Sequence, residues 1–150
     1  PKTQLEILID NADNDDFDSI TQLADAYFYG SIKSCQIDIS MEDAIKYRTK
    51  AAIKDPTYLF KLAEMFRFGY GCEIDKSFAF GLYLAVENDV PDAIETCINM
   101  ISEGIGVDKN SDKARHIQEI DKENAKTELL NDYAQQMNNA KDYLHPEYPK

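Results

Sequence analysis

A short pattern of glycine and apolar residues recurs in this chain after 35 positions. The string FRFGYG at 66–71 returns as ISEGIG at 101–106, with both glycines in register. Ala44, Ala79 and Ala114 keep the same step. A fixed period in this range indicates stacked repeats, in which each unit buries its apolar face against the next. We therefore expect an array of similar units, and such arrays usually hold partners.

The units themselves are predicted to be helical. Apolar residues recur at spacings of three and four almost throughout, and no convincing period-two strand occurs. Glycines at 30, 69 and 104 end helices, because glycine tolerates the left-handed conformation that closes them. The sequence leaves open whether the last two predicted helices are continuous, because Glu123-Asn124 between them is only a weak helix breaker. The predicted helices cover about 3–12, 16–29, 40–53, 55–68, 75–88, 91–103, 110–124 and 125–143.

These elements predict one all-α domain, an α-α superhelix (solenoid) of about three helix-pair repeats with capping helices at both ends. The closing helix should cover the exposed end of the stack, as repeat arrays require. The tail His145-Pro146-Glu147-Tyr148-Pro149 is expected to fray. The predicted boundaries are 1–15 for the N-terminal cap, 16–54, 55–90 and 91–124 for repeats one to three, and 125–150 for the C-terminal capping helix and tail.

Each unit carries a similar set of small, apolar and glycine residues. Unit one has Leu23, Ala24, Tyr27, Gly30, Asp38, Ala44, Tyr47, Ala51 and Ala52; unit two has Leu62, Ala63, Phe66, Gly69, Gly71, Asp75, Ala79, Leu82 and Val86; unit three has Cys97, Ile98, Ile101, Gly104, Gly106, Val107, Ala114 and Ile117. Over about 17–122 this set resembles Sel-1-like repeats, relatives of the tetratricopeptide repeat. The resemblance implies antiparallel helix pairs whose first helices line a concave face, where partners often bind.

Two departures from the family pattern stand out. Unit one lacks the second glycine and has a loop four residues longer, because Gly30 and Gly69 are 39 residues apart. Unit three has Ile101 where the family has an aromatic residue and Asp121-Lys122 where it has a small pair. We expect unit three to have an unusual neighbour.

The concave-face residues follow from the helical spacing. If Leu23, Leu62 and Cys97 are buried, the residues at offsets of −1, +2 and +6 should be more exposed. Tyr29 and Phe68 are the strongest candidates, since aromatic residues make good interface anchors, although they could instead pack on neighbouring loops. The candidate partner-binding set is Gln22, Asp25, Tyr29, Lys61, Glu64, Phe68, Thr96, Asn99 and Glu103.

Charge and composition restrict the partner. The net charge is −12, which argues against nucleic acid and favours a basic protein, although it could serve solubility alone. No run of 18 apolar residues predicts a membrane span. The N-terminus lacks the pattern of a signal peptide, so we expect a cytoplasmic protein, or a periplasmic or secreted one if the chain is processed. Three cysteines, an odd count, suit free thiols in a reducing compartment.

No catalytic, metal or cofactor site is predicted. A pair of Cys97 and His116 could make a nucleophile, but Cys97 takes a core position of the repeat. Gly69-Tyr70-Gly71 is not followed by the Lys or Ser/Thr of a phosphate loop. An acidic cluster lacks the glycine and closing Glu of a calcium loop and suits a solvated turn. Its members are Asp10, Asp13, Asp15, Asp16 and Asp18.

The leading hypothesis is a non-enzymatic module that binds another protein, expected to be basic, through its concave face. A sharper version is an immunity or inhibitor protein that neutralises a cationic toxin or enzyme. A small repeat-fold hydrolase would need a site around His116 or the acidic turn. An assembly role would use the ends of the stack for self-association, and the sequence leaves the oligomeric state open.

Overall fold

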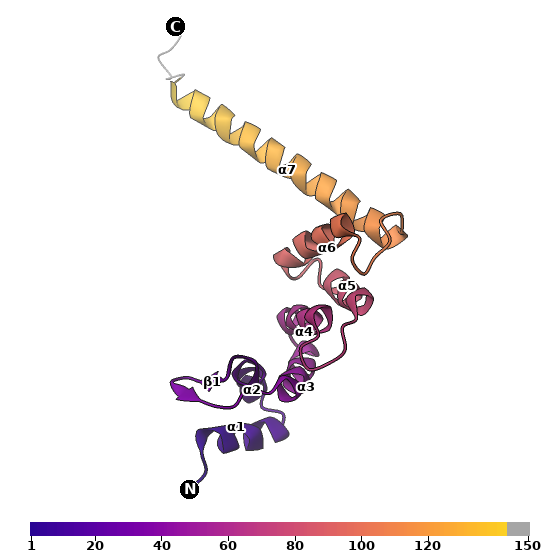
Figure 1. The fold of residues 1–150 in the computed structure, drawn as a ribbon. Helices are drawn as coiled ribbons and strands as arrows, with labels where there is room; N and C mark the ends of the chain where they lie inside the picture. The colour runs from indigo at the N-terminus through magenta and orange to yellow at the C-terminus, as the bar shows by residue number, and fades with distance from the viewer. Residues whose placement is uncertain (144–150) are drawn as a thin grey trace.

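The chain folds as a curved array of helices in the computed structural model, which describes residues 1–143, with side chains to residue 139. In Figure 1, α2, α4 and α6 lie toward the inner side of the curve, and α3 and α5 toward the outer side. The predicted all-α solenoid is confirmed. The described elements are α1 (Gln4–Asp13), α2 (Phe17–Tyr29), β1 (Ser31–Ile32), β2 (Cys35–Gln36), α3 (Met41–Ala52), α4 (Pro56–Phe68), α5 (Lys76–Ala85), α6 (Pro91–Glu103) and α7 (Asp112–Tyr143).

Polar side chains before the helices explain where they begin. Ser40 Oγ accepts a hydrogen bond from the Asp43 amide at 3.2 Å, and Asp75 Oδ1 accepts one from the Phe78 amide at 2.9 Å. Such N-caps satisfy amides that the first turn leaves free. In repeat one the cap is Ser40, which is the residue 35 positions before Asp75.

The core consists of the small and apolar residues that repeat along the chain. The alanines at 44, 79 and 114 have no exposed surface, and neither do Leu23 and Ile117. One cluster joins α1, α2 and α3 with Tyr58 of α4, and a second joins α4 to α7. Small residues let paired helices approach closely, so the sequence period marks the packed faces.

The second glycine of each Gly-x-Gly string lies at a close backbone contact between one repeat and the previous one. Gly71 and Gly106 have φ of 75° and 73°. A Cβ on Gly71 would lie 2.6 Å from the Met41 carbonyl oxygen, and one on Gly106 would lie 2.4 Å from that of Lys76. Both contacts are with the first residue of the preceding repeat's second helix, α3 or α5. Repeat one has no such predecessor and carries the buried Ile32 at this position.

Two local expectations were wrong. The loop after α2 contains an antiparallel hairpin that pairs Ser31 with Gln36 and Ile32 with Cys35. Strands of two residues are too short to show a period-two pattern, so the sequence could not reveal them. Helix α5 ends at Ala85 instead of about 88, and the Val86 amide bonds to the Tyr83 carbonyl in a tighter turn that leads to Pro91.

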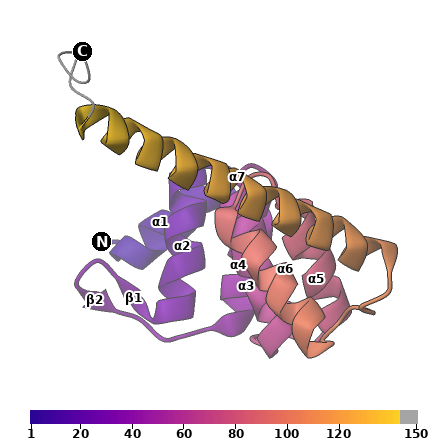
Figure 2. The same ribbon diagram turned by 90° about the horizontal axis from the view of Figure 1, so that it is seen from above.

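The closing helix also differs from the expectation. Residues 112–143 form the single helix α7, so the predicted boundary between 124 and 125 does not separate two elements. Every side chain described from 121 to 139 is exposed, and the helix projects away from the stack instead of covering its end (Figure 1). In Figure 2 it crosses in front of α1 and α2, but Figure 1 shows that they lie apart. The predicted tail at 145–149 lies outside the described residues.

Candidate partner-binding surface

The predicted partner-binding residues lie on the inner helices. Gln22, Asp25 and Tyr29 are on α2, the residues at 61, 64 and 68 on α4, and those at 96, 99 and 103 on α6. Tyr29 and Phe68 are exposed, with 64% and 51% of their surface accessible. Gln22 is exposed too, and so are Asn99 and Glu103, whereas Asp25, Lys61, Glu64 and Thr96 are partly buried.

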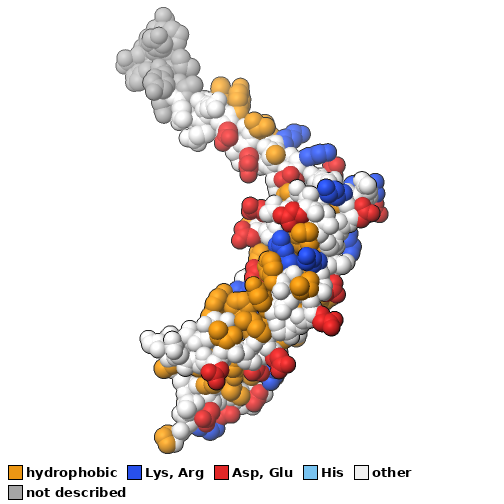
Figure 3. Space-filling view, in the orientation of Figure 1, with side chains coloured by type: hydrophobic (Ala, Val, Ile, Leu, Met, Phe, Trp, Pro, Cys, Tyr) orange, Lys and Arg blue, Asp and Glu red, His pale blue; other side chains and the backbone are white. Residues whose placement is uncertain are grey.

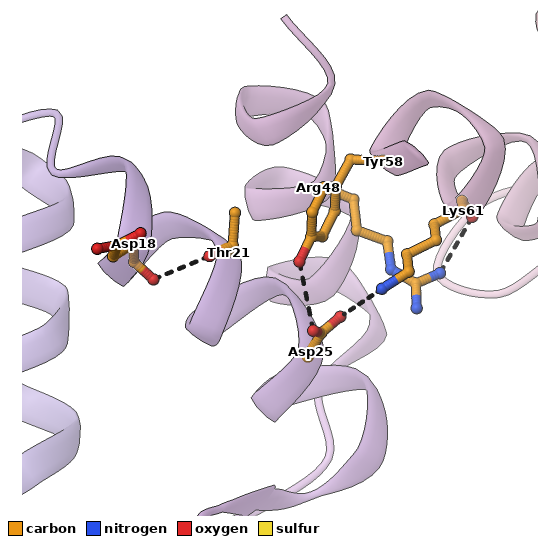
Figure 4. Close-up of polar contacts among 6 residues, drawn as sticks. All are labelled: Asp18, Thr21, Asp25, Arg48, Tyr58 and Lys61. Atoms are coloured by element: carbon orange, nitrogen blue, oxygen red, sulfur yellow. Dashed lines mark hydrogen bonds and ion pairs between the residues drawn. The ribbon is translucent and has the colours of Figure 1, made fainter. Parts of the chain in front are cut away.

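Asp25 joins the first two inner helices. Its Oδ1 accepts a bond from Lys61 Nζ at 3.2 Å, and its Oδ2 accepts one from the Tyr58 hydroxyl at 3.3 Å (Figure 4). Burial, followed by the charge of Asp25, raises the pKa of Tyr58. Asp25 is thus committed to holding α2 against α4, and its carboxylate is only partly available to a partner.

A buried arginine supports the same surface from below. Arg48 of α3 is 1% exposed, and its NH1 donates to the Lys61 carbonyl oxygen at 3.0 Å. Its guanidinium also lies 4.0 Å from the ring centroid of Phe28, a stacking that suits the planar cation. Burial raises the pKa of the neighbouring Glu64, although Arg48 and Lys61 act in the opposite direction. Glu64 is therefore part of the floor of the surface.

Four aromatic rings form a continuous cluster between the inner ends of repeats one and two. The Phe28 ring makes edge-to-face contacts with Tyr29 and Tyr70, with ring centroids 4.9 Å and 5.7 Å apart. The ring centroids of Tyr70 and Phe68 are 5.9 Å apart. Tyr70 is 41% exposed. Edge-to-face contacts hold rings in fixed orientations. We call Phe28, Tyr29, Phe68 and Tyr70 the aromatic cluster, and Figure 3 shows hydrophobic side chains gathered on this side of the molecule.

Two hollows flank the aromatic cluster. The first, of about 310 Å³, brings three predicted residues together with the hairpin and is lined by Gln22, Asp25, Ala26, Tyr29, Ser31, Ile32 and Lys33. The second, of about 330 Å³, brings two predicted residues together and is lined by Arg67, Phe68, Ile74, Lys76, Glu103 and Ile105. Each hollow thus combines an exposed aromatic edge with charged side chains, an arrangement that can accept mixed apolar and charged groups of a protein partner.

Sequence reasoning missed several members of this surface. Tyr70 is the middle residue of Gly69-Tyr70-Gly71, where only the glycines drew attention. Lys33 lies in a hairpin that was not predicted, and its φ of 52° is uncommon for a residue with a side chain. Arg48 carried a weak signal, because it precedes the buried Tyr83 by 35 positions, a step that predicts a buried side chain.

The hypothetical nucleophile pair does not form. His116 Nε2 lies 2.8 Å from Glu87 Oε1. Cys97 is fully buried, and burial, with a smaller contribution from Glu87, raises its pKa to about 12. A catalytic thiol needs the opposite shift, so this pair cannot support the hydrolase hypothesis.

Two of the acidic residues near the first inter-helix turn have partners within the chain. Asp16 Oδ2 accepts from the Ser19 amide at 3.1 Å and caps α2, and Asp10 pairs with Lys2. Within residues 1–139, no three His, Cys, Asp or Glu side chains are grouped to hold a metal ion.

Two further observations bear on the compartment. None of the helices in the described part of the chain combines the length and the apolar character needed to cross a bilayer. Cys35, Cys72 and Cys97 are free thiols. The cytoplasmic location stays a prediction.

Comparison with known structures identifies the architecture. A protective antigen of uropathogenic Escherichia coli that displays an SLR (Sel1-like repeat) fold superposes with a TM-score of 0.63 at 21% identity, over 77% of this chain and 24% of that protein. A Sel1 repeat protein from Oxalobacter formigenes superposes with a TM-score of 0.60 at 20% identity, over 79% of this chain and 88% of that protein. The chain has the Sel1-like repeat fold.

This Sel1-like solenoid spans about a quarter of the length of the E. coli protein. No family model matches the sequence, and a search of curated proteins finds no match.

Proposed function

We propose that this chain is a non-enzymatic protein-interaction module that holds its partner on the concave face. The aromatic cluster carries the proposal, because Tyr29, Phe68 and Tyr70 expose 64%, 51% and 41% of their surface between two hollows. Large apolar side chains gathered on a surface mark interaction sites more reliably than single exposed ones. Aromatic rings are also the side chains that most often dominate binding energy.

The surface is prepared for binding before a partner arrives. The Phe28 ring is fixed by Arg48 beneath it at 4.0 Å and by Tyr70 at its edge. Asp25 links α2 to α4 through Tyr58 and Lys61. Because these contacts already restrict the rings and the spacing of the helices, little conformational freedom has to be lost on binding, which increases affinity.

A basic partner is supported by the charge of the whole molecule more than by the face itself. The net charge of −12 attracts cations over long range. On the face, Asp25 is paired with Lys61, and Glu64 is partly buried among cations, so Glu103 in the second hollow is the most available predicted carboxylate. We therefore expect charge to set the association rate and the aromatic cluster to set the dissociation rate.

An inhibitor of a cationic toxin or enzyme is the second candidate. It requires the same concave face and the same acidic field, and differs in the consequence of binding, which is loss of the partner's activity. Retention of that activity in the complex would leave the adaptor role as the better account.

The aromatic cluster can be tested with a matched control. The double variant Tyr29→Ala, Phe68→Ala should fold normally and bind a protein captured from the source organism at least about tenfold more weakly than wild type, since buried aromatic anchors often contribute 2 kcal/mol or more each. Ile53→Ala removes an apolar side chain that is 83% exposed and lies at the end of α3, so it should leave binding unchanged. Isothermal titration with the purified partner measures both. Equal affinities of wild type and the double variant would overturn the proposal.

Salt separates the charge component. With the same partner, raising ionic strength from 50 to 500 mM should slow association steeply and leave dissociation almost constant, because screening acts on the encounter. An association rate that does not change with salt would exclude a basic partner but would leave concave-face binding intact.

A further inference from the structure

The second hollow carries two cations that have no ionic partner in the described part of the chain. Arg67 comes from α4 and Lys76 is the first residue of α5, and both line the hollow beside the exposed Phe68. None of the ion pairs among the described residues includes either cation. Glu103 is the one acid among the lining residues, so the charges of the hollow sum to +1 in a protein of net charge −12. The hollow therefore has the opposite sign of charge from the whole molecule.

The repeat pattern does not require either cation. None of the four residues that take the places of Arg67 and Lys76 in the neighbouring repeats is charged. They are Phe28 and Ser102 for the first position, and Met41 and Ser111 for the second. Lys76 also begins α5, where the helix dipole makes a cation unfavourable. Departures from local preference are expected at functional sites, so these two cations are candidates for a role in binding.

Two rings of the aromatic cluster already contact cations of the chain itself. The guanidinium carbon of Arg48 lies 4.0 Å from the ring centroid of Phe28, and that of Arg67 lies 5.1 Å from the ring centroid of Phe68. Arg48 is buried, and its Nε has no hydrogen-bond partner among the described residues. A Lys or Arg side chain of a partner would meet like charge behind both rings, whereas an anionic group would be attracted to them.

The acidic residues nearby offset these cations only in part. Glu103 is exposed at the end of α6, and no described cation lies within 4.0 Å of its carboxylate. Asp75 precedes Lys76, but it accepts the Phe78 amide and does not line the hollow. Charges more than about 8 Å away are largely screened at physiological salt. The side chains that line the hollow therefore decide which charge it accepts, and the net charge of the molecule does not.

We propose that the second hollow binds a carboxylate side chain of the partner, an Asp or Glu that stands next to an apolar residue in an internal segment. The carboxylate lies between Arg67 and Lys76, where a guanidinium offers two parallel hydrogen bonds and an ammonium offers a point charge. The neighbouring apolar side chain packs on Phe68, Ile74 and Ile105, which complete the lining together with Glu103.

This mode of binding rests on the proposed function, because it takes place on the same concave face. It also agrees with a partner that is basic as a whole. The net charge of −12 acts on the whole partner during the encounter, whereas the hollow acts on one segment after contact. The segment is apolar as well as acidic, because Phe68 and Ile74 expose 51% and 59% of their surface at the hollow.

Random dodecapeptides displayed at the N-terminus of a phage coat protein test the chemistry of the segment. The displayed peptides have no free C-terminus, so a carboxylate in the selected peptides comes from a side chain. Selection on the full chain at physiological salt should enrich Asp or Glu beside Phe, Leu or Ile, in peptides that do not bind the Tyr29→Ala, Phe68→Ala variant. An acidic protein attracts basic peptides without specificity, so its net charge cannot produce this result.

Charge substitutions then test the hollow with a selected acidic peptide, synthesised with an amidated C-terminus. Lys76→Gln and Arg67→Gln should each weaken binding about fivefold or more, because each removes one cation that holds the carboxylate. Glu103→Gln should tighten binding about twofold, because it removes a like charge from the hollow. The matched control Lys46→Gln removes an exposed cation from the outer helix α3 and should leave the affinity unchanged. Isothermal titration measures the affinities, and thermal unfolding checks that the variants are folded.

The results separate this inference from the proposed function. Selected peptides that are basic or purely apolar, and that still require Tyr29 and Phe68, would overturn the inference and leave the proposed function standing. A Lys76→Gln variant that binds the acidic peptide as well as wild type, or a Glu103→Gln variant that binds it more weakly, would do the same. Failure to select any peptide that depends on Tyr29 and Phe68 would overturn the proposed function, and the inference with it.

Discussion

The two halves of α7 belong to one unbroken helix but have different surroundings. In the first half, Ala114 and Ile117 are fully buried against α6. In the second half, every described side chain from 121 to 139 is exposed. Helix α6 has 13 residues and α7 has 32, so α7 extends far beyond the helix on which it packs (Figure 1). Burial, and not helix formation, therefore marks where the repeat array ends.

Truncating one apolar side chain in each half should give the largest contrast. Ile117→Ala should lower the free energy of unfolding by about 2–5 kcal/mol, because it leaves a cavity in a packed core. Leu129→Ala should change it by less than about 0.5 kcal/mol, because that side chain is already in water. Urea unfolding of dilute protein, followed by circular dichroism, measures both. Similar losses in the two variants would show that the projecting half packs against the body.

A pair of glycines tests how the first half of α7 is positioned. Gly104 and Gly106 both have left-handed backbones, with φ of 70° and 73°. Alanine in that conformation costs about 1–2 kcal/mol at either site. At Gly106 the new Cβ would also meet the Lys76 carbonyl, whereas at Gly104 the nearest atom beyond the adjoining residues, Lys109 Cε, would be 3.9 Å away.

Gly106→Ala should therefore destabilise the protein by at least about 1 kcal/mol more than Gly104→Ala, because backbone atoms have to move. Thermal unfolding at equal concentration gives the difference. Equal melting temperatures would mean that the contact with α5 does not position the loop before α7.

The smallest effects are expected from removing one hydroxyl group in each half of the comparison, that of Ser111 before the packed half of α7 and that of Thr127 in the projecting half. Ser111 Oγ accepts a bond from the Ala114 amide at 3.2 Å, and Thr127 Oγ1 donates to the Glu123 carbonyl at 3.0 Å. Ser111→Ala should cost about 1 kcal/mol through loss of the N-cap. Thr127→Ala should cost nothing or stabilise slightly, since alanine has the higher helix propensity. Urea unfolding midpoints of the two variants measure the difference. A larger loss for Thr127→Ala than for Ser111→Ala would contradict the prediction and would show that the projecting half contributes more to stability.

The period of 35 residues predicted the fold because it records side chains that must be small or apolar. Ala44, Ala79 and Cys97 are buried where the repeat places them. The exposed Tyr29 and Phe68 were also found by helical spacing, but their role in binding stays a prediction. Helical spacing alone did not reveal Tyr70 or Lys33, because one lies between glycines and the other in a hairpin too short to leave a pattern.

The end of α7 escaped prediction for a different reason. Leu129, Leu130 and Tyr133 repeat the spacing of a packed helix, so the sequence predicted a cover for the stack. Periodicity shows that a stripe exists, but its direction depends on the phase relative to Ile117, which is fixed only once the two segments are known to form one straight helix. That phase turns the stripe outward.

Gly71 and Gly106 separate the shape of the scaffold from the chemistry of its binding surface. Each of these glycines lies against the backbone at the start of α3 or α5. The contact between successive repeats at this point therefore does not depend on which side chains line the concave face. Exposed residues such as Gln22, Tyr29 and Asn99 can then be exchanged without altering these glycine contacts. The same framework could be given a new specificity by resurfacing three helices, with the curvature held constant.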